Sequence, residues 1–237
     1  MNRLFRACVT PKNDLNILKR SFTVSNVERS TCHSIKKYHF HSNINSIYKS
    51  KLFSTRIKNY FSKNKALDNM INNLSNLDFT SNFKNDCRII LEDCKLLLEK
   101  KDIDDIYKIL EKEYFVIENS MNKNKYYKQE LVKTDVLTAY LLIWGSNAET
   151  DIHFHASNGC YSYNLNGSWK ETIYKNFNYS NNLIKKTQSL KSGDITYINN
   201  YIGAHQIKFL GNLDIDNKLD HKNFGFSINI YSPTSEI

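Results

Sequence analysis

The sequence lacks several features that would place it in common classes of protein. It has no run of about eighteen apolar residues, which argues against a membrane-spanning helix, and we expect no membrane association. Its five cysteines are odd in number and form no CxxC pair, so the sequence predicts neither a disulfide framework nor a cysteine zinc site. A reducing compartment is therefore expected.

Acidic residues are scarce at the N-terminus. Residues 1–65 contain only Asp14 and Glu28 among many lysines and arginines, so they account for the net charge of +9 while the remainder is mildly acidic. A nucleic-acid-binding protein needs its basic residues on the folded surface, so we expect no nucleic-acid partner. The segment is typical either of a mitochondrial transit segment or of a disordered, Asn-rich tail. We divide the chain into an N-terminal extension, 1–65, and a folded part, 66–237, located in the cytoplasm or mitochondrion.

Two short helices are predicted in the first part of the folded region. A polar, Asn-rich bridge occupies about 66–86. The segment 88–101 places leucines and isoleucines among charges, which is typical of an amphipathic helix. A second helix is expected to follow, capped by Asp102 and continuing to about Tyr114, because its apolar residues recur at intervals of three and four.

From about Leu137 the pattern changes to short runs that are rich in β-branched and aromatic residues. The predicted strands are LTAYLLIW, CYSYNLN, SWKETIYK, DITYINNYI, HQIKFL and FGFSINIY. Asn166-Gly167 predicts a hairpin between two of them, and Gly193-Asp194 predicts a turn before another. Many short strands joined by turns predict a mainly β protein, a sandwich or a barrel, preceded by short α-helices.

The histidines offer a candidate metal site. In a strand, residues i and i+2 project from the same face, so His153 and His155 are expected to point the same way. His205 also lies in a predicted strand, whereas His221 lies in a charged loop where solvation is expected. Three neutral imidazoles would leave a divalent ion with open coordination positions for an anionic substrate and a small oxidant.

Several separate motifs, in order and spacing over about 127–233, resemble the cysteine dioxygenase family of thiol dioxygenases. They are Trp144-Gly145, His153-Phe154-His155, Cys160, Asn166-Gly167, Lys170-Glu171-Thr172, Tyr197-Ile198-Asn199-Asn200, Gly203-Ala204-His205 and Tyr231-Ser232-Pro233. The resemblance implies a cupin jelly-roll β-barrel preceded by helices, which agrees with the pattern of elements above.

The resemblance also implies roles for individual residues. His153, His155 and His205 match the ligands of an iron(II) ion. Cys160 stands where ordinary cupins have a glutamate, and with Tyr231 it matches the pair that forms a thioether cross-link. The phenol of Tyr231 would donate a hydrogen bond to substrate or dioxygen, and a covalent bond to Cys160 would hold its ring in place.

The chain departs from the family at the expected substrate contacts. In the segment Tyr127-Lys128-Gln129-Glu130-Leu131, Gln129 takes the position of a family arginine that binds the substrate carboxylate. Tyr127 and Gln129 are therefore the candidate substrate contacts. If the alignment is shifted by one residue, Lys128 takes this position instead. Glutamine has only neutral donors, and its presence resembles the 3-mercaptopropionate dioxygenases. Asn229 replaces a histidine and cannot titrate near neutral pH.

The expected activity is the addition of both atoms of dioxygen to the thiol of L-cysteine, which gives cysteine sulfinate. Dioxygen and a small thiol would then be the partners of a monomeric enzyme. Two alternatives stay open: a dioxygenase acting on 3-mercaptopropionate or another small thiol, and a non-catalytic cupin that binds a metal.

Overall fold

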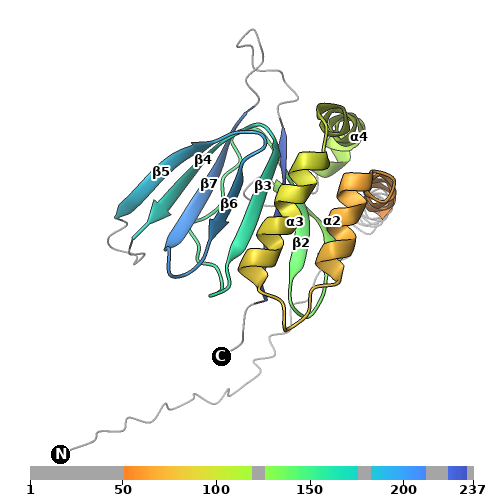
Figure 1. Cartoon of the computed structure of the whole chain (residues 1–237). Helices are drawn as coiled ribbons and strands as arrows, with labels where there is room; N and C mark the ends of the chain where they lie inside the picture. Colours follow the sequence, from red (N-terminus) through yellow and green to blue (C-terminus); the bar gives the residue numbers. More distant parts are fainter. Residues whose placement is uncertain (1–50, 119–125, 176–182, 212–223, 234–237) are drawn as a thin grey trace, which may run out of the picture. The chain divides into compact units, whose positions relative to one another are not determined.

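The computed structural model describes residues 51–118, 126–175, 183–211 and 224–233 (Figure 1). Its elements are α2 (Lys65–Ser75), α3 (Phe83–Leu97), α4 (Lys100–Glu118), β1 (Tyr126–Lys133), β2 (Thr138–Trp144), β3 (Cys160–Asn166), β4 (Ser168–Tyr174), β5 (Ile184–Leu190), β6 (Ile195–Ile198), β7 (Ala204–Gly211) and β8 (Gly225–Tyr231). A further helical segment covers 51–61. The expected extension up to residue 50 and His221 lie outside the described residues.

Local side-chain contacts explain where the helices begin. The side chain of Asn64 accepts a hydrogen bond from the backbone N–H of Leu67 at the start of α2. At the start of α3, the side chain of Asn82 accepts one from the N–H of Asn85. Asp102 acts from inside the first turn of α4, where its carboxylate accepts a hydrogen bond from the N–H of Glu99 at 2.9 Å. Asp102 therefore does take part in capping, but α4 begins three residues earlier than a cap at Asp102 predicts.

The helical region is larger than the sequence predicted. Residues 51–61, which the sequence pattern places in the extension, are helical, and α2 occupies about half of the expected polar bridge. Phe53, Ile57 and Phe61 are at most 1% exposed and belong to the hydrophobic core. Their spacing of four residues places them on one helical face, and this apolar face is buried although the surrounding sequence is polar.

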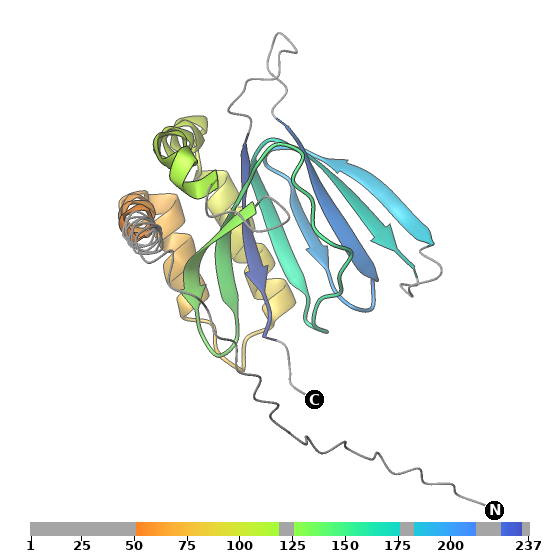
Figure 2. The same cartoon turned by 180° about the vertical axis from the view of Figure 1, so that it is seen from behind.

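Two antiparallel sheets follow the helices. The larger has the strand order β1-β2-β8-β3-β6, and the smaller has the order β5-β4-β7. The helices contact the larger sheet, α2 and α4 at β1 and α3 at β3, and the view from behind shows this arrangement from the side of β1 and β2 (Figures 1 and 2). This is a cupin-like β fold preceded by helices, as the sequence predicted. Among the described helices, none is long and apolar enough to cross a membrane.

Alternation along β8 separates the core from the functional region. Phe226, Ile228 and Ile230 are fully buried in the core cluster that the helices complete. Ser227, Asn229 and Tyr231 point to the other face, where they line a cavity. The strand thus supplies apolar side chains to one layer and polar side chains to the space between the sheets.

One predicted pairing is wrong. Asn166-Gly167 forms a tight turn, with Gly167 at φ +99°, but β3 pairs with β6 and β8 whereas β4 pairs with β5 and β7. The turn therefore carries the chain from one sheet to the other and does not close a hairpin. The predicted turn before β6 is confirmed, since Gly193 has φ +87°.

Candidate metal centre

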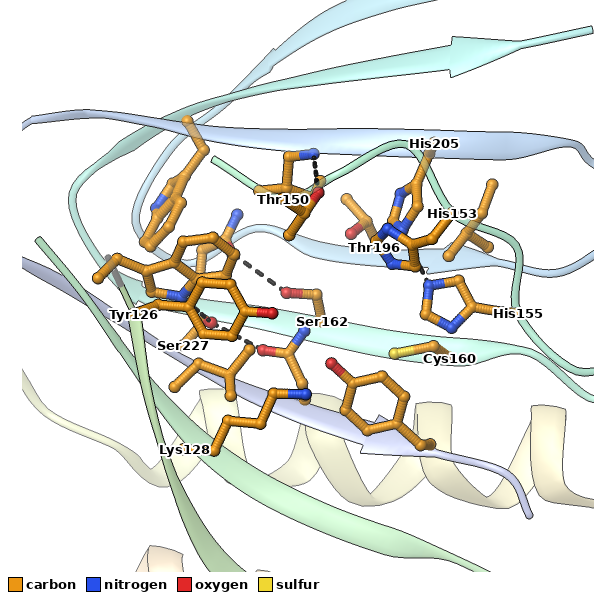
Figure 3. Close-up of a pocket in the computed structure, with 18 of the residues that line it drawn as sticks. Tyr126, Lys128, Thr150, His153, His155, Cys160, Ser162, Thr196, His205 and Ser227 are labelled. Carbon is orange, nitrogen blue, oxygen red and sulfur yellow. Dashed lines mark hydrogen bonds between the residues drawn. The ribbon is translucent and has the colours of Figure 1, made fainter. Parts of the chain in front are cut away.

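A cavity of about 250 Å³ lies among the inward-facing side chains of both sheets (Figure 3). Its lining includes Tyr126, Lys128, Leu142, Trp144, Thr150, Asp151, His153, His155, Cys160, Ser162, Asn164, Trp169, Thr196, Ile198, His205, Ile207, Ser227, Asn229 and Tyr231. This volume is below the roughly 300–1,000 Å³ of sites for drug-sized ligands, so the cavity suits a small molecule.

The three predicted histidines meet at one end of this cavity. His205 lies in β7, and its backbone forms a two-way bridge with His153, whose N–H donates to the carbonyl of His205 at 3.0 Å. His155 follows in the same extended segment, while Phe154 between them is 50% exposed. One ring nitrogen from each histidine lies within 4.8 Å of the others, and Nε2 of His155 is 2.9 Å from Nε2 of His205.

The electrostatics of the cluster keep imidazoles neutral. Burial, followed by the neighbouring histidines and Lys128, lowers the pKa of His155 to about 3. Burial also lowers the pKa of His153, although the hydrogen bond between its Nδ1 and the carbonyl of Asp151 opposes this effect. A neutral imidazole presents a lone pair to a metal ion, and ring nitrogens from all three histidines converge closely enough to fit one divalent ion.

A buried carboxylate orients His205. Nδ1 of His205 is 2.7 Å from Oε1 of Glu171, and Nε2 of Gln188 donates to Oε2 of the same carboxylate at 2.5 Å. Glu171 is only 2% exposed and lies on β4, next to the β7 strand that carries His205. The contact holds the ring so that Nε2 faces the other histidines. The sequence motif contains Glu171, but its contact with His205 depends on the pairing of β4 with β7, which the motif alone does not predict.

Cys160 and Tyr231 stand side by side next to the histidines. They are directly paired residues of β3 and β8, and both line the cavity. The ring centres of His155 and Tyr231 are 5.7 Å apart. Burial raises the pKa of the Cys160 thiol, and burial likewise raises the pKa of Tyr231 well above its ordinary value, so both groups keep their protons at neutral pH.

Two of the expected substrate contacts, Tyr127 and Gln129 on β1, do not line the cavity. Tyr127 and Gln129 are paired with Ile143 and Leu141 and face the helices, where Nε2 of Gln129 donates to the carbonyl of Glu130 at 2.9 Å. Lys128, on the opposite face, lines the cavity.

A β-bulge follows these residues in β1. The register slips between Glu130 and Val132, so Leu131 is an extra residue without a partner on β2. Before the bulge, Lys128 is the residue that faces the cavity, which agrees with the alternative placement of Lys128 at the substrate contact. Nζ of Lys128 lies 5.6 to 5.7 Å from the ring centres of Tyr126, Tyr140 and Tyr231.

Asn229 lies in the cavity, and a chain of hydrogen bonds fixes its amide. Nε1 of Trp144 donates to Oγ of Ser227 at 3.2 Å, and this hydroxyl donates to Oδ1 of Asn229 at 2.7 Å. The amide nitrogen faces Cys160, and its hydrogen bond lowers the pKa of the thiol, which opposes the larger effect of burial. Asn229 is therefore a rigid, uncharged donor beside the candidate metal centre.

The fold and the histidine cluster together define a cupin with a three-histidine metal site. The chain belongs to the cysteine dioxygenase type I family, which matches residues 97–236.

Individual relatives agree with this assignment. Cysteine dioxygenase type 1 from Rattus norvegicus and from Homo sapiens are each 30% identical to the chain over 95 residues, which is 39% of this chain and 43% of the relative. The match thus spans less than half the length of these relatives.

Solved structures show more distant similarity. An RmlC-like cupin from Shewanella frigidimarina has 18% identity and a TM-score of 0.35, covering 49% of this chain and 84% of its own. KdgF from Halomonas sp. has 15% identity and a TM-score of 0.35, covering 48% and 84%.

Proposed function

We propose that this protein binds iron(II) at His153, His155 and His205 and adds both atoms of dioxygen to the thiol of a small substrate, which gives a sulfinate. L-cysteine is the first candidate substrate. The observation that carries the proposal is the meeting of three histidines with Cys160 and Tyr231 at one end of a small cavity. When bound, iron(II) would supply open coordination positions and the oxygen chemistry.

Lys128 supports the choice of a thiol that also carries a carboxylate. Its ammonium group reaches into the cavity over the rings of Tyr140 and Tyr231, and the described residues include no carboxylate paired with it. An ammonium is a compact point charge, so it would hold one carboxylate oxygen without the forked geometry of an arginine. It would orient the substrate with its sulfur toward the histidines.

Tyr231 would act as a hydrogen-bond donor in the reaction. Burial raises the pKa of its phenol, so the proton stays on oxygen and can be donated to a bound anion. Asn229 would contribute a second, neutral donor that does not change with pH. Asn229 is only 9% exposed, and hydrogen bonds in such a buried environment are stronger than in water.

We also propose a thioether between Cys160 and Tyr231. Directly paired residues on neighbouring antiparallel strands have Cβ atoms about 4.5–5.5 Å apart, which brings a cysteine sulfur near the edge of an opposite phenol ring. Forming the carbon–sulfur bond would remove one hydrogen from the thiol and one from the ring. Dioxygen would accept these two electrons and two protons and become hydrogen peroxide.

Oxygen uptake tests the proposal. The full-length protein would be loaded with iron(II) and supplied with L-cysteine or with 3-mercaptopropionate, and a His205→Ala variant would be measured in parallel. We expect rapid uptake that requires both thiol and metal and is lost in the variant. A preference for 3-mercaptopropionate would support the alternative substrate within the same chemistry.

A non-catalytic metal-binding cupin is the alternative of a different class, and the replacement of a histidine by Asn229 favours it. Such a protein would be stabilised against thermal unfolding by the thiol and the metal but would consume no oxygen above the His205→Ala background. That result would overturn the dioxygenase proposal.

A further inference from the structure

A turn of four residues connects the histidine cluster to the candidate cross-link. Residues 156–159 run from His155, whose ring lies among the three histidines, to Cys160 at the start of β3. The N–H of Gly159 donates to the carbonyl of Ala156 at 2.9 Å, which closes the turn. The placement of this turn therefore fixes where His155 and Cys160 stand relative to each other.

Two side chains from the neighbouring strand β6 and its end hold the 156–159 turn. The hydroxyl of Tyr197 donates to the carbonyl of Asn158 at 2.9 Å. Nδ2 of Asn199 donates to the carbonyl of Ser157 at 3.1 Å and to the hydroxyl of Tyr197 at 3.2 Å. Tyr197 and Asn199 belong to one of the sequence motifs, but neither lines the cavity. Their contacts point to a role outside direct substrate binding.

Asn199 also holds the turn that leads to His205. Its Oδ1 accepts from the N–H of Ile202 at 3.0 Å, and its backbone carbonyl accepts from the N–H of Gly203 at 3.2 Å. An amide oxygen can only accept and an amide nitrogen can only donate, so both ends of the side chain are committed. The nitrogen holds the turn after His155, and the oxygen holds the turn before His205.

Tyr197 is a rigid support for the 156–159 turn. Its ring centre is 4.8 Å from that of Tyr161, and Nζ of Lys84 lies 4.8 Å from the same ring centre. The hydroxyl of Tyr161 donates to the carbonyl of Lys84 at 2.7 Å. Gly159 has φ +85°, and a Cβ added there would overlap the carbonyl oxygen of Ile198 and lie 2.7 Å from the Tyr197 ring. The turn thus has no room to move towards β6, and the hydrogen bonds oppose movement away from it.

We propose that Asn199 is a positioning residue for the metal centre, because its amide fixes the turn after His155 relative to the turn before His205. His153 is placed by its β-bridge to His205, whereas His155, in the part of the chain that the structure describes, belongs to no strand or bridge. The position of His155 therefore depends on the turn that follows it. This inference rests on the proposed binding of a metal ion at the three histidines, but it does not require dioxygenase activity.

Asn199→Asp tests the inference, because it keeps the oxygen that accepts from Ile202 and replaces the N–H that donates to Ser157 by a second oxygen. The probe is cobalt(II), a divalent ion whose absorption spectrum depends on its coordination geometry, added anaerobically to the full-length protein. We expect its dissociation constant to rise about tenfold and its absorption bands to shift. Asn200→Asp makes the same charge change at the next residue, which is exposed, and should leave both quantities unchanged.

A role confined to stability would give a different pattern. It would lower the midpoint of thermal unfolding of the metal-free Asn199→Asp protein but leave the dissociation constant and the spectrum of the folded protein unchanged, and that result would overturn the inference. Tyr197→Phe removes the hydroxyl that accepts from Asn199 and should also weaken cobalt(II) binding. Its effect should be less than additive with that of Asn199→Asp, because the two residues share a hydrogen bond. If Asn199→Asp does not fold, unchanged binding in Tyr197→Phe would overturn the inference instead.

Oxygen uptake separates this inference from the proposed function. Thiol-dependent uptake by wild type, together with unchanged cobalt(II) binding in the variants, would refute only the positioning role of Asn199. Weaker cobalt(II) binding in the variants, together with no uptake by wild type, would refute only the dioxygenase activity. Equal binding of cobalt(II) by wild type and His205→Ala would refute both.

Discussion

Replacing Glu171 by glutamine tests how the protein holds His205. The carboxylate has two oxygens, one facing Nδ1 of His205 at 2.7 Å and the other accepting from Nε2 of Gln188 at 2.5 Å. A glutamine side chain has the same shape but only one acceptor atom. Either His205 or Gln188 must therefore lose its acceptor inside the protein, where Glu171 is 2% exposed.

The expected effect is a loss of metal affinity. Contacts that orient a metal-binding histidine typically change affinity by about 10–100-fold when removed, which is about 1.4–2.7 kcal/mol. We expect the dissociation constant for iron(II), measured anaerobically by competition with a chelator, to rise within this range in Glu171→Gln. The histidines themselves are unchanged, so the variant should still bind metal.

Glu149→Gln is the matched control for this experiment. This substitution is chemically the same, but the side chain of Glu149 is 51% exposed. Its Oε2 lies 3.6 Å from Nζ of Lys208 and forms an exposed ion pair. Its effect on metal affinity should be negligible, because exposed ion pairs contribute little. An unchanged dissociation constant in Glu171→Gln, or an equal change in both variants, would refute the reasoning, provided that circular dichroism shows both proteins folded.

Three further predictions concern substrate binding, the cross-link and stability. Lys128→Met should raise KM for carboxylate-bearing thiols about tenfold or more, because it removes a charged hydrogen bond, and Lys128→Arg should restore a low KM. An unchanged KM for Lys128→Met in oxygen-uptake assays would argue against Lys128 as the substrate contact. After turnover, mass spectrometry should find wild type lighter by two hydrogen atoms than its sequence, and Cys160→Ala should show no such loss. Burial raises the pKa of the Cys94 thiol from 9.0 to about 12, so this thiol ionises at lower pH in the unfolded state than in the folded state. The free energy of unfolding should therefore fall as pH rises from about 9 to 12. Urea unfolding should show a shallower decline with pH for Cys94→Ala than for wild type.

Much of the metal site was predictable because its residues carry a local pattern. His153 and His155 are two positions apart in an extended segment, so they share a face whether or not a regular strand forms there. The alternation along β8 likewise placed Ser227, Asn229 and Tyr231 together. Both inferences depend only on the period of extended chain, which tertiary structure seldom changes.

The other features of the fold and the site depend on strand register and tertiary packing, which a single sequence does not reveal. The extra residue at Leu131 exchanges the faces of β1, and nothing in the sequence marks it as a bulge. The polar surroundings of Phe53, Ile57 and Phe61 concealed a buried helical face. The role of Glu171 arises only when β4 and β7 pair, because this pairing brings its carboxylate to His205.

The most direct test of the account is to identify the product formed from L-cysteine and isotopically heavy dioxygen by the iron-loaded, full-length protein. We predict a sulfinate in which both new oxygen atoms are heavy and whose formation disappears in His205→Ala. A sulfinate formed equally by the variant, or a product that contains heavy oxygen at one position only, would contradict the proposed reaction.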